Sequence, residues 1–185
     1  MQRTERPVRE LWAQGDADSA CFLYCLVNAA FLLNGKQVTG AKWRKAISQM
    51  PARADDFLSG VGTGRIGDHP ESLQKLSDSF MSALGVSIES EVIHDVSSHN
   101  KLSKSVKANQ VVILAINNGD HWVTAVDTSR SEIYYACSAQ ALSGRLPYAE
   151  ETSPRLGRLY NARATFSDLK VWDSFAILLT RSTEE

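Results

Sequence analysis

The chain has 185 residues, of which 43% are hydrophobic and 22% charged, a composition that excludes a disordered or collagen-like protein. Twenty Lys and Arg residues against 21 Asp and Glu give a formal net charge of −1, so no overall basic charge attracts nucleic acid or an anionic membrane. The three cysteines are too few, and odd in number, for a disulfide scaffold, which favours free thiols in a reducing compartment. We expect a single domain over residues 1–185.

The N-terminal half of the chain is expected to be helical. A polar arm, residues 1–18, precedes a helix predicted over residues 20–34, which Asp18 or Ser19 can cap and which Gly35 closes. Nearly every face of this helix is apolar, which is typical of a central helix that is buried on several sides.

Two further helices are predicted over residues 40–50 and 71–84. Between them, residues 52–70 hold four glycines within eight positions and show no clear period. This segment is predicted to be the longest loop of the chain and a candidate lid over a cleft.

Strands are expected in the C-terminal half, where the apolar residues alternate or form short β-branched runs. The predicted strands cover residues 86–93, 111–116, 121–127, 132–138 and 171–180. A polar connector is expected over residues 94–110, and residues 139–165 are expected to be irregular. Helices followed by a mostly antiparallel sheet indicate an α+β fold.

No segment resembles a targeting signal. The first twelve residues lack the apolar core of a secretory signal, and no apolar run reaches the ~18 residues of a membrane span. We expect a cytoplasmic protein, with secretion as an effector without a cleaved signal peptide as the alternative. The sequence leaves the oligomeric state open.

Cys21 is the first candidate for a reactive side chain. It falls in the first turn of the predicted central helix, where backbone N–H groups and the helix dipole favour a thiolate. The competing interpretation is a simply buried thiol, since cysteine is among the most buried residue types. Cys25, one turn further along, is interpreted as a small core residue.

His121 is the second candidate. It starts a predicted strand directly after an Asn-Asn-Gly-Asp turn, which places it at the rim of the sheet. A rim histidine can meet the end of a helix that packs on the sheet, so a thiolate–imidazolium pair with Cys21 is expected. The alternative is an ordinary surface or turn histidine.

These segments resemble the papain-like cysteine peptidases, and among them the C39 group of bacteriocin-processing peptidase domains. The resemblance rests on Gln14 ahead of the first cysteine, on the Cys-x3-Cys-Leu pattern of Cys21–Leu26, and on the Asp-His-Trp-Val run of Asp120–Val123. It implies a papain-like domain in which a central helix in the N-terminal half bears the nucleophile and packs on the sheet. It implies Cys21 as nucleophile, His121 as base and Gln14 as oxyanion donor, with Cys25 structural.

The chain departs from the family at three positions. Gln14 is one residue further from Cys21 than usual, and Phe22 stands where the family has a glycine. Cys137 stands sixteen residues after His121, where the family has an aspartate, so the third member of the site is open. A dyad or a degenerate site remains among the alternatives.

The spacing along the strand excludes one substitute for that aspartate and suggests another. Asp127 shares a strand face with His121, but six residues of strand separate the two by about 20 Å. If Asp127 lies opposite Glu132 in a hairpin, His121 lies opposite Ser138 on one face. We therefore predict Ser138 as the hydrogen-bond partner of the imidazole, with Cys137 replacing it if a bulge shifts the register.

Two weaker patterns are interpreted as having no ligand. Gly62-x-Gly64-x-x-Gly67 matches a dinucleotide fingerprint, but no predicted strand precedes it. His94, Asp95 and His99 lie in the polar connector without a further strong metal ligand. We expect neither a cofactor nor a metal ion.

The sequence thus predicts a thiol-dependent hydrolase or acyl transferase that acts on a peptide or amide bond through Cys21 and His121. The expected partner is a peptide or protein substrate, with no nucleic acid and no membrane. Peptidase, glutamine deamidase and transferase remain open as activities. A non-catalytic papain-like binding domain, or a structural protein with buried thiols, are the alternatives from other classes.

Overall fold

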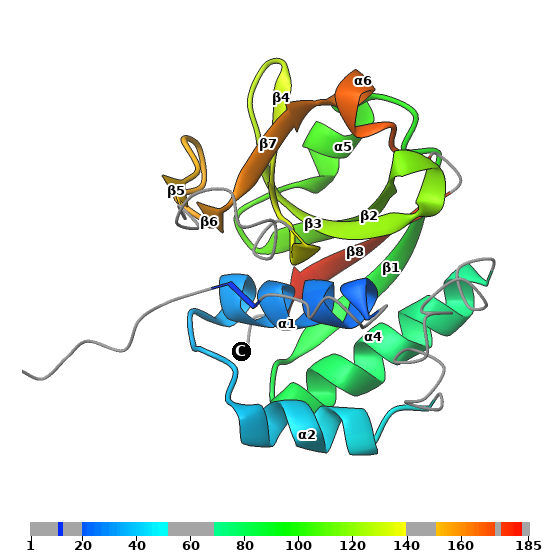
Figure 1. Ribbon diagram of the computed structural model, residues 1–185, viewed down its shortest axis with the longest axis vertical. Helices are drawn as coiled ribbons and strands as arrows, with labels where there is room; N and C mark the ends of the chain where they lie inside the picture. Colours follow the sequence, from blue (N-terminus) through cyan, green and yellow to red (C-terminus); the bar gives the residue numbers. More distant parts are fainter. Residues whose placement is uncertain (1–10, 13–19, 52–68, 140–150, 173–174, 183–185) are drawn as a thin grey trace, which may run out of the picture.

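The computed structural model describes residues 11–12, 20–51, 69–139, 151–172 and 175–182, and the account below concerns these (Figure 1). The helices are α1 (Cys21–Asn34), α2 (Gly40–Ser48), α4 (Pro70–Leu84), α5 (His99–Ser105) and α6 (Phe166–Leu169), with one 3-10 turn, η2 (Asn117–Gly119). No helix among the described residues is long and apolar enough to cross a bilayer.

The strands form one larger and one smaller antiparallel sheet. They are β1 (Ile88–His94), β2 (Gln110–Ile116), β3 (His121–Thr128), β4 (Glu132–Ala136), β5 (Glu151–Thr152), β6 (Leu159–Tyr160), β7 (Ala162–Thr165) and β8 (Phe175–Arg181). The larger sheet has the order β1-β8-β2-β3-β4-β7, and every neighbouring pair in it is antiparallel. The last strand of the chain, β8, therefore lies between β1 and β2, in the middle of the fold.

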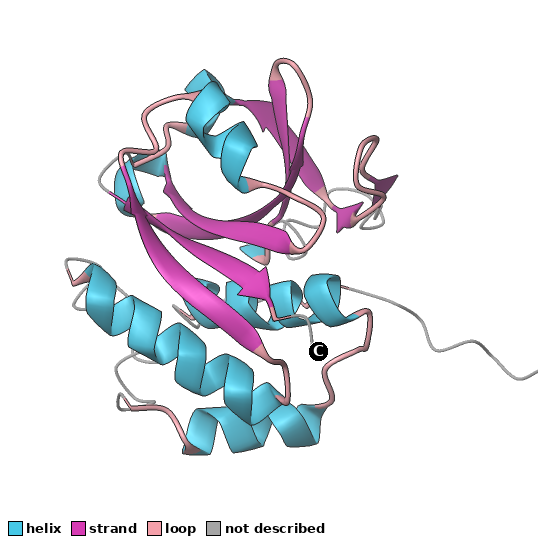
Figure 2. Ribbon diagram, turned by 180° about the vertical axis from the view of Figure 1, so that it is seen from behind, coloured by secondary structure: helices cyan, strands magenta, loops and turns pink. Residues whose placement is uncertain are grey.

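Helices cover both faces of the larger sheet. In Figure 1, α1 lies directly beneath the sheet and α2 and α4 lie beyond it, whereas α5 lies on the opposite face, as Figure 2 shows from behind. In β2, Val111 and Ile113 face the core around α1, and Val112 and Leu114 face the core around α5. Because both of its faces are covered, β2 is apolar from Val111 to Ile116 instead of alternating.

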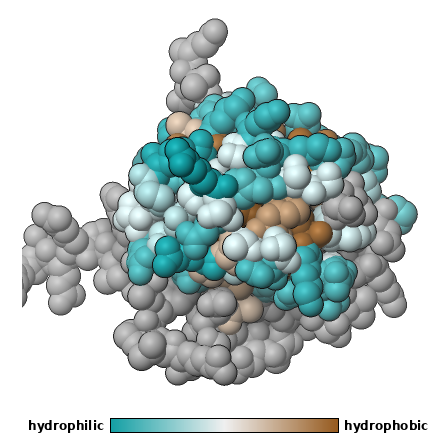
Figure 3. Space-filling model, turned by 90° about the horizontal axis from the view of Figure 1, so that it is seen from above, coloured by the Kyte–Doolittle hydropathy of each residue, from teal (hydrophilic) through white to brown (hydrophobic). Residues whose placement is uncertain are grey.

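The molecule seen from the side of α6 has a mostly hydrophilic surface with a small apolar area in its middle (Figure 3). The second core, around α5, lies on this side of the sheet and includes partly buried residues such as Phe166 and Val171.

The central helix α1 is buried on nearly all sides, as its sequence predicts. Eleven of its fourteen residues are buried, and Gly35 ends it in the left-handed conformation at φ 68°. The predicted cap at Asp18 or Ser19 is wrong, because Ala20 is the N-cap and makes no side-chain cap hydrogen bond. The helix therefore begins at Cys21, which is its first residue.

The predicted connector and the irregular region hold more structure than expected. The connector 94–110 contains α5, which Ser98 caps by accepting the N–H of Lys101 at 3.4 Å. The region 139–165 contains β5, β6 and β7, and β7 completes the edge of the larger sheet beside β4. The strands are too short for a period to show in the sequence, whereas the helical spacing of Lys101, Lys104 and Lys107 does indicate the exposed face of a helix in the connector.

The predicted register of the hairpin β3–β4 is wrong. Asp127 lies opposite Tyr134 instead of Glu132, and Ala125 lies opposite Tyr135. Val126 is an extra residue on β3, a β-bulge that changes which side chains of the two strands share a face. This one residue decides what lies beside His121.

Candidate active site

Cys21 is held at the start of a helix that packs on β3. The ring of Phe22 meets that of Trp122 edge to face, with centroids 5.1 Å apart. One turn further, the Thr124 hydroxyl donates to the carbonyl of Cys25 at 3.1 Å. These contacts fix the first turn of α1 against the beginning of β3, where His121 lies.

The surroundings of Cys21 suit an anionic sulfur. Cys21 is 7% exposed, and burial by itself disfavours a charge, but the first turn of α1 contains no acidic residue. The N–H groups of a first helical turn have no carbonyl within the helix to donate to, and they form the positive end of its dipole. A thiolate at this position is stabilised by both.

Cys25 has the opposite environment. It is 1% exposed, and burial raises the pKa of its thiol well above the ordinary value. Negative charge on Cys21 or Cys137 would raise this pKa further, whereas the Thr124 hydroxyl lowers it. Cys25 is therefore expected to remain a protonated core thiol.

An unusual turn before His121 determines where β3 begins. Asn117, Asn118 and Gly119 precede it with φ of 53°, 61° and 100°, a run of left-handed backbone that asparagine and glycine adopt at the least cost. The Asn118 N–H donates to the carbonyl of Lys170 at 3.2 Å, which ties the turn to the segment before β8. The Asn-Asn-Gly sequence thus sets where β3, and with it His121, begins.

The imidazole of His121 is half-buried, and burial lowers its pKa below the ordinary value. Among the described residues, the hydrogen bond of the ring joins Nε2 and Sγ of Cys137, which are 3.3 Å apart. A thiol offers no full charge to an imidazolium, so the neutral ring is the favoured form.

The contact with Cys137 corrects the predicted contact with Ser138. Because of the bulge at Val126, Thr124 pairs with Ala136, and alternation then puts Cys137 on the face that includes His121. Ser138 is buried, but it does not hydrogen-bond the His121 ring. A bulge is the condition under which the sequence predicts Cys137 in this place.

Asn161 is a residue near the site that sequence reasoning did not find. Its Oδ1 accepts the N–H of Cys137 at 2.8 Å, and its Nδ2 donates to the carbonyl of Cys137 at 2.7 Å. It lies between β6 and β7, within the region expected to be irregular. No local pattern marks it, since its role depends on a residue 24 positions earlier in the chain.

Other predicted site features are not brought together. No hydrogen bond joins Cys21 to the ring of His121 in this arrangement of the described residues. Gln14, residues 52–68 of the candidate lid over 52–70, and the glycine pattern from Gly62 lie outside the described residues, and Pro70 already belongs to α4. The roles of Cys21, His121 and Gln14 therefore stay predictions.

Asp127 lies far from His121 along β3, as expected, and is fully buried. It accepts hydrogen bonds from the N–H groups of Thr128, Arg155 and Leu156 and from Nε of Arg155, at 2.8–3.0 Å. Burial alone would raise the pKa of Asp127, but these hydrogen bonds outweigh it and hold the pKa below its ordinary value. Asp127 therefore anchors the loop between β5 and β6.

The histidines and the carboxylate of the connector do not form a metal site. Asp95 pairs with Lys101 at the surface. His99 contacts the carbonyl of Glu132 through Nε2 at 3.4 Å. Within the described part of the chain, no group of three or more His, Cys, Asp or Glu residues could hold a metal ion.

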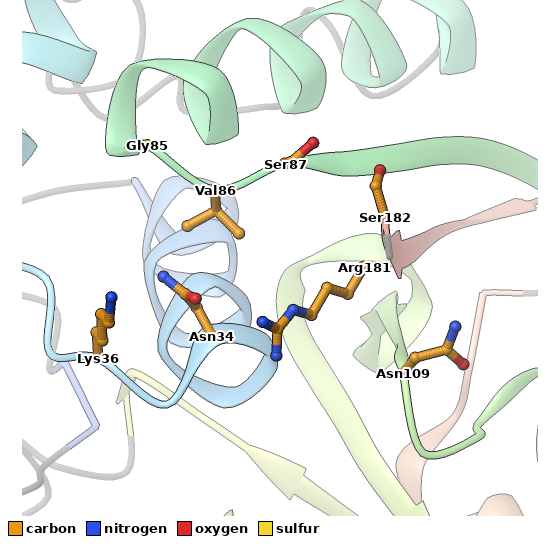
Figure 4. Close-up of a pocket in the computed structure, with 8 residues that line it drawn as sticks. All are labelled: Asn34, Lys36, Gly85, Val86, Ser87, Asn109, Arg181 and Ser182. Atoms are coloured by element: carbon orange, nitrogen blue, oxygen red, sulfur yellow. The ribbon is translucent and has the colours of Figure 1, made fainter. Parts of the chain in front are cut away.

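A hollow of about 660 Å³ lies at the opposite end of α1 from Cys21 (Figure 4). It is lined by Asn34, Lys36, Gly85, Val86, Ser87, Asn109, Arg181 and Ser182. Arg181 donates through Nη1 to the carbonyl of Leu33 at 3.1 Å. Its guanidinium group therefore interacts with the C-terminal end of α1. The hollow contains none of the cysteines or histidines of the candidate site.

Comparison with known proteins defines the fold. No family model matches the sequence, and no curated protein matches it. The structure is similar to a double glycine motif protease from an AMS/PCAT transporter, solved in complex with the leader peptide. The TM-score is 0.52 at 12% identity, over 94% of this chain and 91% of that one.

Two further solved structures were found. The peptidase domain of Streptococcus ComA, a bi-functional ABC transporter, has a TM-score of 0.49 at 12% identity, over 95% of this chain and 100% of that one. The Pseudomonas avirulence protein AvrPphB has a TM-score of 0.37 at 10% identity, over 89% and 91%.

The chain has an α+β, papain-like fold of the kind found in C39 peptidase domains. The likeness to the double glycine motif protease, over nearly the whole of both chains, confirms the fold that the sequence predicted. Cys21 at the start of the central helix and His121 at the start of a strand occur within this fold.

Proposed function

We propose that the protein is a thiol-dependent peptidase or acyl transferase with Cys21 as nucleophile and His121 as general base. The observation that supports it best is the position of Cys21 as the first residue of a central helix in a papain-like fold. The contact of α1 with β3, the strand that His121 begins, is the second support.

The proposed reaction has two half-reactions. His121 takes the proton of the Cys21 thiol, and the sulfur attacks the substrate carbonyl carbon to give a tetrahedral intermediate. The N–H of Cys21, at the first position of α1, is suited to hold the oxyanion, with Gln14 as the second proposed donor. His121 then protonates the leaving amine, and water or another nucleophile attacks the thioester and restores the thiol.

A peptide is the proposed substrate. The double glycine motif protease to which this chain is similar in fold was solved with a leader peptide. A polypeptide also suits the chemistry, because the proposed intermediate is a thioester formed from an amide carbonyl. The neutral His121 that burial favours can accept the thiol proton at neutral pH.

Alkylation by iodoacetamide at pH 6, followed by mass-spectrometric mapping, tests the nucleophile. We expect the label on Cys21, because the helix terminus favours its thiolate, and no label on Cys25, whose thiol burial keeps protonated. The variant His121→Gln should slow the labelling of Cys21, and Cys25→Ser should leave it unchanged.

Hydrolysis of a library of quenched fluorescent peptides tests the activity in the same variants. Cys21→Ala should abolish turnover, while Cys25→Ser should retain it. Label on Cys25 or Cys137 alone, or turnover by Cys21→Ala, would overturn the assignment. Labelling of Cys21 without cleavage of any peptide in the library would count against a peptidase.

A further inference from the structure

Cys137 needs a support of its own, because it lies one residue beyond the end of β4. Up to Ala136, the strand is held by backbone ladders, to β3 on one side and to β7 on the other. The last pair recorded with β7 joins Tyr135 to Ala162. Cys137 lies beyond the last pair of both ladders, so contacts outside the ladders position its backbone beside the ring of His121.

Asn161 supplies that support. Its own N–H donates to the carbonyl of Tyr135 at 3.3 Å, which sets its backbone in line with β7. Its side-chain amide then accepts the N–H of Cys137 and donates to the carbonyl of Cys137, at 2.8 and 2.7 Å. The amide thus takes the place of one more backbone residue and extends the β4–β7 ladder by one pair.

The bulge at Val126 selects which side chain this support presents. With Thr124 opposite Ala136, the next residue, Cys137, lies diagonally across from His121 on the same face. The resulting contact joins Nε2 of the ring to Sγ at 3.3 Å. Cys137 is 5% exposed, so water does not compete strongly for this contact.

We propose that Asn161 is a positioning residue of the catalytic imidazole and acts by holding Cys137 against Nε2 of His121, where a carboxylate is the usual partner. The proposal rests on the function proposed above for Cys21 and His121. The Nε2–H of the ring donates to the sulfur of Cys137, which leaves the other ring nitrogen, Nδ1, unprotonated and able to accept the proton of Cys21. Cys137 orients the ring in this way without adding a charge.

The chemistry of sulfur supports these separate roles, in which Asn161 holds Cys137 and Cys137 orients the ring. A thiol sulfur is a weak hydrogen-bond acceptor, so its hydrogen bond to the His121 ring is weak unless other groups hold Cys137 in place. The two hydrogen bonds of the Asn161 amide to the backbone of Cys137 contribute to holding that geometry. Burial already lowers the pKa of His121, and an uncharged partner leaves that effect in place.

The ring can be followed by NMR of protein labelled with ¹⁵N-histidine, whose shifts report the tautomer and the pKa without any substrate. The His121→Gln variant identifies its signals among those of the four histidines. In the wild type, we expect the Nε2–H tautomer to dominate above the pKa. In Asn161→Ala and in Cys137→Ala, the tautomer ratio should shift toward Nδ1–H by the same amount.

Kinetics provide the second measurement. Asn161→Ala should lower kcat about tenfold and leave KM nearly unchanged, because it disturbs the ring and not the binding surface. The double variant Asn161→Ala/Cys137→Ala should lose no more than Cys137→Ala alone, since both changes break one chain of contacts. Asn109→Ala, an exposed asparagine elsewhere, is the matched control and should leave both the NMR signals and kcat unchanged.

A second variant tests the proposal if Asn161→Ala does not fold. Asn161→Asp keeps the acceptor for the Cys137 N–H but replaces the donor to the Cys137 carbonyl, so a smaller shift in the same direction is expected. An unchanged tautomer ratio in folded Asn161→Ala or Asn161→Asp would overturn the proposal, as would additive losses in the double variant. If the wild type has no thiol activity, the proposed function fails while the NMR result still decides the positioning of the ring.

Discussion

The two ends of β3 give a polar side chain opposite surroundings. At the end of the strand, Asp127 is fully buried and accepts hydrogen bonds from three backbone N–H groups and from Nε of Arg155. At the beginning, His121 is half-buried and meets the uncharged sulfur of Cys137. The charged form is stabilised at one end and disfavoured at the other.

The difference separates a structural site from a chemical one. A buried charge with every acceptor position satisfied holds its neighbours in place and has nothing left for a substrate. A half-buried imidazole with one weak partner can change its protonation state at a small cost. The same strand therefore provides an anchor at one end and the candidate active site at the other.

The hydrogen-bond network at the Asp127 end of β3 includes a second arginine. Arg158, which is 8% exposed, donates to the carbonyls of Lys107, Ala108, Gln110 and Val126, and burial lowers its pKa to about 10. Together with Arg155, it fastens the loop between β5 and β6 to the strands beside it. This loop leads directly to Asn161, so the anchor also bears on the position of Cys137.

The largest effect is expected from Asp127→Asn. The amide of asparagine cannot accept hydrogen bonds from all of these donors, because its NH₂ group would face N–H groups. The free energy of unfolding should therefore fall by about 3 kcal/mol. Urea denaturation at pH 7 measures this. Glu91→Gln, which changes an exposed carboxylate in β1, is the control and should stay within about 0.5 kcal/mol of the wild type.

The pH dependence provides a second test of Asp127. Its folded pKa is lowered, so its contribution is complete above the unfolded value of 3.8 and is lost as the pH falls through the folded pKa. Asp127→Asn should therefore destabilise the protein less at pH 3 than at pH 7. Equal losses at both pH values would mean that the charge of Asp127 contributes nothing.

Cys137→Asp would make the His121 end resemble the Asp127 end. A carboxylate at Nε2 should raise the pKa of His121 and increase the alkylation of Cys21 at pH 6 by about tenfold, the change that one pKa unit produces. The rate of labelling with iodoacetamide measures it. Cys137→Asn, of the same size but uncharged, should give no such increase, and equal rates in the two variants would contradict the electrostatic argument.

Thr124→Val tests the middle of β3. It removes the hydroxyl that donates to the Cys25 carbonyl, and the free energy of unfolding should fall by about 1 kcal/mol. Because Thr124 faces α1 and not Cys137, the tautomer of His121 should not change. A shifted tautomer ratio in this variant would show that the two faces of β3 are coupled.

The smallest effect is expected from His121→Gln on stability. Burial depresses the pKa of His121, so the unfolded chain binds this proton more readily, and stability falls as the pH drops below the unfolded value of 6.5 toward the folded pKa. Denaturation at pH 5 and pH 8 should differ less in His121→Gln than in the wild type. The exposed His94→Gln is the control, and a wild-type difference in His121→Gln would contradict a lowered pKa.

Local patterns in the sequence determined the framework of the site. The apolar run before Gly35 predicts the central helix, and the Asn-Asn-Gly turn predicts a strand that begins at His121, because both signals depend on neighbouring residues alone. These two elements are enough to indicate the α+β fold and the two candidate residues at the starts of a helix and a strand.

Tertiary structure alone decided what lies beside His121. The bulge at Val126 replaces Ser138 with Cys137, because strand side chains alternate and one extra residue reverses the face. Asn161 holds Cys137 from 24 residues away, and Arg155 reaches Asp127 from 28 residues away. Such contacts leave no period or spacing in the sequence, since they exist only once the strands have paired and the loops have packed against them.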